Sequence, residues 1–374
     1  TWNAVVSGVV TFSVNVSKSS YLSYTHTIEF FVAPPNAAQI LWDESHGTYF
    51  THTSEQVWDQ FYNDLVYEKG FAVRVHSTGP INETTLQDID ILILPPPGEG
   101  QPLSASEALA IRTWVEAGHS LFVVGTEDRH WGAGNETGTL NLITAPWGVE
   151  FFYSQIHDAT DNSYESNAPI FSLKNPFIDS QHPIIRSLPS SVAEIAFKQG
   201  CALNLTQSGI SIIGCGDEDA FTDLQNNNFP TPTAGDLIGY AHTVGMAALT
   251  VGTDGRVFVS GSASFLQNDY TPNYYDRNKA FMDTVLAWLN HTLNPSLARA
   301  SLELSISVSQ PINNVQSPCN ISIFVKSAEK LVLDANVTLY WRAYSSHLTS
   351  IAPNGAFSGT ISFYEVGSID LSVC

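Results

Sequence analysis

The first 35 residues show the alternation of apolar and polar side chains that is typical of β-strands. Every second residue is apolar over residues 10–16, and the pattern returns over residues 24–32. A period of two places one face of a strand against a core, so we predict two strands here. Two strands alone cannot bury a face, so residues 1–35 are predicted to complete another sheet or to be the tail of a β-domain.

From residue 36 to residue 294 short apolar runs alternate with segments that have helical spacing. The runs ILIL, SLFVV and GRVFVS are typical of buried strands. Helical spacing appears over residues 54–67, in SASEALAIRTWVEAG, which begins with a Ser cap and ends at Gly118, and in NKAFMDTVLAWLNH. This order predicts an α/β domain with a parallel sheet over residues 36–294.

Strict alternation returns in the last part of the chain. It runs through residues 302–308, 319–325 and 335–341, with turn residues between these segments. Short strands at a spacing of about a dozen residues predict an immunoglobulin-like β-sandwich over residues 295–374.

The charge of the chain excludes one class of partner. Its 36 acidic and 15 basic residues give a net charge of −21. Such a field repels nucleic acids and anionic membrane surfaces, so no nucleic-acid partner is predicted. No apolar run reaches the roughly 18 residues that a membrane-spanning helix needs, so no span is predicted in this chain.

Seven Asn-x-Ser/Thr sequences indicate passage through the secretory pathway. Asn15 lies on the polar face of the first predicted strand, which suits a glycan; chance in a Ser/Thr-rich chain is the alternative. The chain begins at Thr1, so removal of a signal peptide or of a longer upstream segment is predicted, with a secreted or cell-surface location. The seven are Asn15, Asn82, Asn135, Asn204, Asn290, Asn320 and Asn336.

Four cysteines allow three pairings, and their positions favour two of the possible bonds. Cys201 is expected to pair with Cys215, and Cys319 with Cys374. An oxidising compartment would keep both pairs as disulfides.

Five segments in a fixed order carry a resemblance to a known family. They are ILWDESHGTYF, DIDILILPPP, SASEALAIRTWVEAGHSLFVVG, the HPI that starts at His182, and GRVFVSGSASFLQND. This order, over residues 39–291, resembles the glutamine-amidotransferase-like domain of unknown function in archaeal and bacterial surface proteins. It is also similar to the non-catalytic region that follows the protease domain in site-1-protease-like subtilases.

The resemblance implies a flavodoxin-like three-layer fold, with any ligand at the carboxyl ends of the strands. It implies no activity, because a fold does not determine a function. Family members carry Gly-Asp-Ser after the last strand, where this chain has Gly261-Ser262-Ala263, and many carry Asp where this chain has Thr126. Both differences argue against an acidic catalytic or metal site.

The sequence contains none of the usual nucleophile motifs. No cysteine follows a strand on the tight turn that an amidotransferase needs, and Gly-x-Ser-x-Gly is absent. Subtilase Asp, His and Ser motifs are absent as well. Ser262 and Ser264 follow a predicted strand, where they are expected to cap a turn, and we therefore predict no enzymatic activity.

Two groups of polar residues remain as ligand or cation candidates. Asp43, Glu44 and His46 follow the first strand of the α/β domain, and the predicted topology places them near the GTEDRH segment. The alternative is that Asp43 and Ser45 bond the loop backbone while His46 packs beneath it. The partner segment contributes Glu127, Asp128 and His130.

Two acidic loops are candidates for Ca²⁺, although neither has EF-hand spacing, and solvated loops are the alternative. Apart from this ion no cofactor is predicted. The residues are Asp158, Asp161 and Glu165 in the first loop, and Asp217, Glu218, Asp219 and Asp223 in the second.

The predicted function is that of a non-catalytic extracellular glycoprotein region with a structural or recognition role. Exposed β edges would dock protein partners or further copies of the chain. The first alternative is an accessory region of a secreted subtilisin-like protease, which would bind its catalytic domain. The second is a divergent hydrolase that uses Glu44, His46 and Glu127.

Overall fold

The computed structural model describes six ranges with their side chains and, outside them, several strands by their backbone. The ranges are residues 37–53, 57–127, 137–162, 168–224, 231–268 and 273–293. The chain divides into two units, Thr1–Leu293 and Asn294–Cys374.

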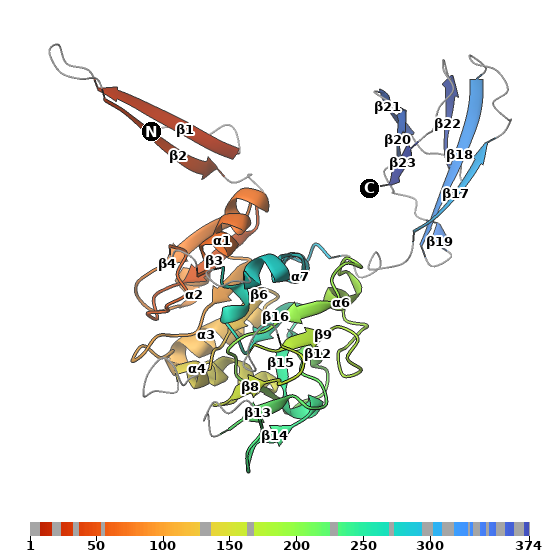
Figure 1. The fold of residues 1–374 in the computed structure, drawn as a ribbon. Helices are drawn as coiled ribbons and strands as arrows, with labels where there is room; N and C mark the ends of the chain where they lie inside the picture. The colour runs from red at the N-terminus through yellow and green to blue at the C-terminus, as the bar shows by residue number, and fades with distance from the viewer. Residues whose placement is uncertain are drawn as a thin grey trace. The chain divides into compact units, whose positions relative to one another are not determined.

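A mixed sheet of seven strands forms the centre of the first unit (Figure 1). Five neighbouring strands are parallel, while β15 runs antiparallel to β16 and β12 antiparallel to β15. The prediction of a parallel sheet therefore holds for five of these strands. In sheet order they are β12 (Ser211–Cys215), β15 (Val244–Val251), β16 (Gly255–Ser260), β6 (Ser120–Val124), β5 (Ile91–Leu94), β3 (Gln39–Asp43) and β4 (Ala72–His76).

The parallel strands follow the order 2-1-3-4-5 when they are numbered along the chain, which is the strand order of flavodoxin-like sheets. Right-handed crossovers in this order place the first and last helices on one face and the others on the opposite face. Figure 1 shows α1 and α7 above the strands and α3 below them.

Helices and helical turns connect these strands. The helix predicted from residue 54 begins later, at Asp59, because Trp58 has a non-helical backbone and buries its ring. The elements are α1 (Asp59–Asn63), continued by η1 (Asp64–Glu68), α2 (Glu83–Leu86), α3 (Ala105–Glu116), α4 (Glu136–Thr139), α5 (Asn141–Thr144), η2 (Ala145–Trp147), α6 (Pro183–Arg186), η3 (Tyr240–His242), η4 (Ser264–Leu266) and α7 (Tyr274–Leu289).

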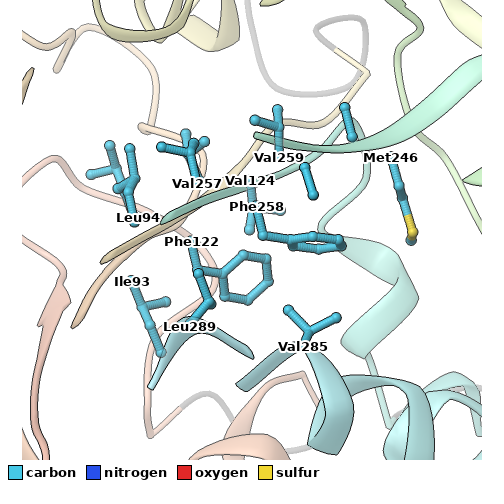
Figure 2. Packing of buried hydrophobic residues seen from close by; sticks show 14 of the residues in the cluster. Ile93, Leu94, Phe122, Val124, Met246, Val257, Phe258, Val259, Val285 and Leu289 are labelled. Carbon is cyan, nitrogen blue, oxygen red and sulfur yellow. The ribbon is translucent and has the colours of Figure 1, made fainter. Parts of the chain in front are cut away.

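Aromatic side chains fill the space between the sheet and the helices α1 and α7. Phe122 and Phe258 lie opposite each other on β6 and β16, with ring centroids 5.6 Å apart. Figure 2 shows both rings in the core beside Val285 and Leu289 of α7. Phe61 of α1 contacts Phe122, and Phe281 of α7 contacts Phe258. This face of the sheet is therefore sealed from water.

Short sheets complete the first unit, and most of their strands carry no clear sequence pattern. The strands predicted before residue 35 are present as an antiparallel pair. The pairs and the triplet are β1 (Gly8–Val16) with β2 (Tyr24–Val32), β7 (Val149–Phe151) with β11 (Leu203–Leu205), β9 (Ile170–Ser172) with β10 (Glu194–Ala196), and β8 (Gln155–His157) with β13 (Phe221–Asp223) and β14 (Leu237–Ile238).

The second unit contains two antiparallel sheets. Strands are present in all three predicted segments. One sheet is built from β17 (Leu302–Val308), β18 (Pro318–Ser327), β19 (Lys330–Leu331) and β22 (Ala356–Ser362), and the other from β20 (Val337–Trp341), β21 (Tyr344–Leu348) and β23 (Asp370–Val373).

The predicted Cys201–Cys215 disulfide is not formed. Both cysteines are fully buried, but they have different backbone partners. The Cys201 thiol donates to the carbonyl of Gly261 at 3.5 Å, whereas Cys215 ends β12 opposite Val244. Burial raises the pKa of the Cys215 thiol to about 12. Cys319 and Cys374 lie outside the residues whose side chains are described.

Among the residues that the structure describes, no helix combines the length and hydropathy needed to cross a membrane.

Replacing Phe122 by Ala is expected to lower the free energy of unfolding by about 3–5 kcal/mol, because a fully buried ring leaves a cavity between sheet and helices. Leu109→Ala is the control, since Leu109 on α3 is 56% exposed, and its effect should stay within about 0.5 kcal/mol. Chemical denaturation followed by tryptophan fluorescence measures both. Equal effects of the two changes would contradict this description of the core.

Candidate functional site

A cavity of about 380 Å³ lies where the loops after β3, β5 and β6 meet. In the sheet, β3 has β4 on one side and β5 on the other, so the chain reverses its direction of winding between β3 and β5. Open α/β sheets bind ligands at this point, outside the carboxyl ends of the strands. The cavity is lined by residues 47–50, residues 96–99, Thr126 and Thr137.

Two glycines allow the loops on either side of the cavity to touch. The Gly98 amide donates to the carbonyl of His46 at 2.8 Å. A Cβ atom on Gly98 would overlap with the carbonyl group of Gly47, which itself has a φ of 63°. The close approach of the two backbones thus requires glycine at position 98, and the positive φ favours glycine at position 47.

His46 lies beneath the same wall of the cavity and bridges two carboxylates. Its Nδ1 lies 2.7 Å from Asp43 Oδ2, and its Nε2 lies 3.1 Å from Glu107 Oε1. The three side chains are buried, with exposed fractions of 2% for Asp43, 7% for His46 and 7% for Glu107. Both nitrogens of the ring are therefore used inside the protein.

Each carboxylate also holds the backbone around it. Asp43 Oδ1 accepts from the amide and the hydroxyl of Ser45, which closes the turn after β3. Glu107 Oε2 accepts from the amide and hydroxyl of Ser104 in a capping box at the start of α3, and Oε1 accepts from the amide of Ile81. The pair thus ties the β3 loop to the first turn of α3.

The charges of this group shift its pKa values in opposite directions. Burial lowers the pKa of His46. The hydrogen bond and charge of Asp43, together with Glu107, raise it by more than burial lowers it, so the pKa lies above 6.5. Burial raises the pKa of Glu107, but the hydrogen bonds from Ser104 and Ile81 and the charge of His46 bring it below 4.5. The fold therefore keeps the imidazolium form of His46 up to a higher pH than an isolated imidazole would.

The other predicted site residues do not join this group through any contact that the described residues show. Glu44 turns to His52, whose amide and Nδ1 both donate to its Oε1, at 2.6 and 2.7 Å. Glu127 follows β6 and is 1% exposed, and it is not among the residues that line the cavity. Asp128 and His130 lie outside the described residues. Of the predicted cluster, the described residues bring together Asp43 and His46, and they add Glu107.

Glu107 is not among the predicted site residues, because the sequence indicated only a Ser cap at the start of this helix. The Ser-x-x-Glu spacing from Ser104 indicates a capping box, and the structure contains one. A carboxylate that caps a helix has two oxygens and several lone pairs, so it can accept a hydrogen bond from a second partner, here His46. This capacity is the sequence signal that could have identified Glu107.

The serines after β16 were expected to cap a turn, but their hydroxyls bond to residues far away in the chain. The Ser262 hydroxyl donates to the carbonyl of Lys198, and the Ser264 hydroxyl donates to Gln199 Oε1 at 3.5 Å. Ser262 is fully buried and Ser264 is 4% exposed. Neither hydroxyl lines the cavity.

The two predicted acidic loops come together elsewhere in the unit. Antiparallel pairing of β8 with β13 places Asp158, which follows β8, beside Asp217 and Asp219, which precede β13. One carboxylate oxygen from each of the three lies within 4.8 Å of the other two. Burial raises the pKa of Asp158, and the charges of Asp217 and Asp219 raise it further.

The remaining predicted acidic residues stay outside this cluster. Glu218 is exposed, Asp223 is fully buried in β13 and Asp161 contributes its amide rather than its carboxylate. Glu165 lies outside the described residues.

Three predicted glycosylation sites lie in described positions. Asn82 is exposed and its Oδ1 accepts from the amide of Thr85, Asn204 donates to Glu150 Oε2 at 3.0 Å, and Asn290 is half-buried after α7. The side chains of the other four, Asn15, Asn135, Asn320 and Asn336, are not described, so glycosylation stays a prediction.

No protein-family model matches the sequence, and no curated protein does. Several solved structures are similar in part. A ThuA-like protein from Bacteroides uniformis has 11% identity and a TM-score of 0.38, with 70% of this chain and 94% of that chain covered. A ThuA-like protein from Parabacteroides merdae has 8% identity and a TM-score of 0.37 over 69% and 91% of the two chains. A cytoplasmic protein from Salmonella typhimurium has 11% identity and a TM-score of 0.36 over 76% and 95%.

Replacing His46 by Gln is expected to lower the free energy of unfolding by roughly 3 kcal/mol near pH 6, because two buried carboxylates lose their cation. A raised pKa in the fold means that the stabilisation is complete below pH 6.5 and is lost as the pH rises through the pKa of folded His46. The difference between wild type and variant should therefore shrink from pH 6 to pH 9. Denaturation at a series of pH values measures it.

His52→Gln provides the matched control for this experiment. The His52 side chain is 28% exposed, and its amide would still donate to Glu44, so the loss should not exceed about 1 kcal/mol. A His46 effect that equals the His52 effect, or that grows as the pH rises, would contradict the assigned role.

Proposed function

We propose that this chain is a non-catalytic extracellular glycoprotein region with a recognition role, in which the α/β domain is a scaffold that presents the cavity beside β3 and β5. One observation carries the proposal: both imidazole nitrogens of His46 are held by carboxylates. A general base or a metal ligand needs a nitrogen directed at the reacting group. His46 bonds to Asp43 and Glu107, and Glu44 bonds to His52, so these two residues support the loops instead.

The lining of the cavity suits binding rather than group transfer. Tyr49 is 48% exposed at its edge, Phe50 and two prolines supply apolar surface, and Thr48 and Thr126 supply hydroxyls. Glu99 is the charged side chain among the described lining residues. An acidic protein with this lining favours a neutral or cationic polar ligand, such as a glycan or a basic peptide.

The finer fold assignments belong to the same proposal. The 2-1-3-4-5 strand order supports a flavodoxin-like, amidotransferase-like α/β domain of the kind found in surface proteins. Two antiparallel sheets over residues 294–374 support an immunoglobulin-like arrangement. Association through β edges is proposed as well, since β4 ends the central sheet with one side unpaired in the described part. The described residues add no observation in favour of a subtilase accessory role or of hydrolysis.

Glycan and peptide arrays probed with the full chain test the recognition role. Bound compounds are expected to keep their mass after incubation, and Tyr49→Ala is expected to weaken their binding by about tenfold or more, because an exposed aromatic ring supplies contact area at the cavity edge. Tyr67→Ala is the matched control, since Tyr67 is 52% exposed on η1 and does not line the cavity. Titration calorimetry measures both variants.

Two results would refute the proposal. Conversion of a bound compound into a product would favour the hydrolase alternative. Equal binding by the Tyr49 and Tyr67 variants would mean that the ligand binds outside this cavity.

A further inference from the structure

Three carboxylates from two distant loops meet at the end of the small β8–β13–β14 sheet. The register of this sheet sets Phe221 opposite His157, so the residues just after β8 and just before β13 become neighbours. Thr160 and Asp219 are 59 residues apart in the chain, yet the Thr160 hydroxyl donates to Asp219 at 3.1 Å. The same hydroxyl also lies 3.2 Å from Asp158 Oδ1. The loops thus form one group.

Asp158 provides an observation that the acidic character of the loops does not explain. Its side chain is 0% exposed. Oδ1 accepts from the amides of Thr160 and Asp161 at 2.9 and 2.7 Å, while Oδ2 is buried and has no hydrogen-bond partner. A buried carboxylate oxygen without a partner loses its hydration, and no hydrogen bond within the protein compensates for that cost in free energy. Such an oxygen indicates that its partner is a ligand that does not belong to the protein chain.

The charge of the group is also unbalanced within the described structure. One carboxylate oxygen each from Asp158, Asp217 and Asp219 lies within 4.8 Å of the others. No described Lys, Arg or His forms an ion pair with any of the three. Like charges at this separation repel, and the repulsion is strong where one of them is buried.

We propose that Asp158, Asp217 and Asp219 bind one Ca²⁺ ion, which neither the cavity nor the recognition role involves. All three offer oxygen atoms, the ligands of hard cations, and the group contains no His or Cys that would favour a transition metal. Ca²⁺ accepts six to eight oxygens in irregular geometry, which two loops and added water can supply, whereas Mg²⁺ demands a near-ideal octahedron.

The ion would join two segments that the short strands alone connect weakly. β8 and β13 pair over three residues, and β14 adds two. A cation bound to both loops would stabilise this sheet in the folded state, since the unfolded chain cannot hold the three carboxylates together. Calcium is therefore expected to raise the melting temperature of the whole first unit.

Titration calorimetry of the chelator-treated full chain with CaCl₂, in a buffer of moderate ionic strength, tests the site. One Ca²⁺ per chain is expected to bind, and Asp219→Asn is expected to weaken the affinity by at least about tenfold. Asp219 is exposed, so this variant should fold; Asp158→Asn is the second variant, with circular dichroism as the check on folding. Glu218→Gln removes the same charge from the same loop and should bind as the wild type does.

Each alternative result overturns the proposal. Absence of calcium binding by the wild type, or equal affinity in Asp219→Asn and Glu218→Gln, would mean that the loops carry only solvated carboxylates. Tighter binding of MgCl₂ than of CaCl₂ would contradict the identity of the ion.

Discussion

The bridge from Asp43 through His46 to Glu107 holds together the parts of the molecule that form the cavity. It joins the turn after β3 to the first turn of α3, and Glu107 extends the link to the amide of Ile81. The carbonyl of His46 accepts from Gly98, so the loop after β5 depends on the same residue. A buried cation between two carboxylates is stable only while all three partners are present. The wall of the cavity is therefore fixed by electrostatics as well as by packing.

The sheet beneath this bridge explains why the loops can be irregular. Fully buried strands and the aromatic layer between β6, β16 and the helices provide the rigid base, and the loops emerge from one edge of it. Functional side chains on such loops need internal support, because little of the core reaches them. In this molecule Asp43, His46 and Glu107 provide that support. These residues hold the loop after β3 in the position where Gly47 contacts Gly98 of the loop after β5.

Local patterns predicted the elements whose structure is decided locally. The apolar runs became β5, β6 and β16, and the Ser104 cap and Gly118 mark the two ends of α3 closely. Elements decided by distant contacts escaped prediction. Trp58, which the prediction placed inside a helix, precedes α1 instead, where it donates to the carbonyl of Ala263 and buries its ring. The prediction of a Cys201–Cys215 disulfide was wrong because it used only the closeness of the two residues in sequence. In the fold, Cys201 bonds to Gly261 and Cys215 pairs with Val244.

The candidate site divides in the same way. The turn made by Asp43 and Ser45 was among the alternatives that the sequence suggested, since it needs only neighbours two residues apart. Glu107 lies 61 residues beyond His46, and nothing in the local pattern links the two. The meeting of the acidic loops depends on β8 and β13, three-residue strands without a hydrophobic period, so only the fold could reveal it.

The protonation state of His46 is the most direct test of the claim that it supports the structure and does not catalyse. Nitrogen chemical shifts of the histidine rings in the folded chain, recorded by NMR from pH 5 to pH 9, report it for each ring. Both nitrogens of His46 are expected still to carry protons at pH values above 6.5, where most isolated imidazoles have lost one. A neutral ring at pH 6.5, with one nitrogen unprotonated and accessible, would contradict this expectation. His46 would then again be a candidate catalytic residue.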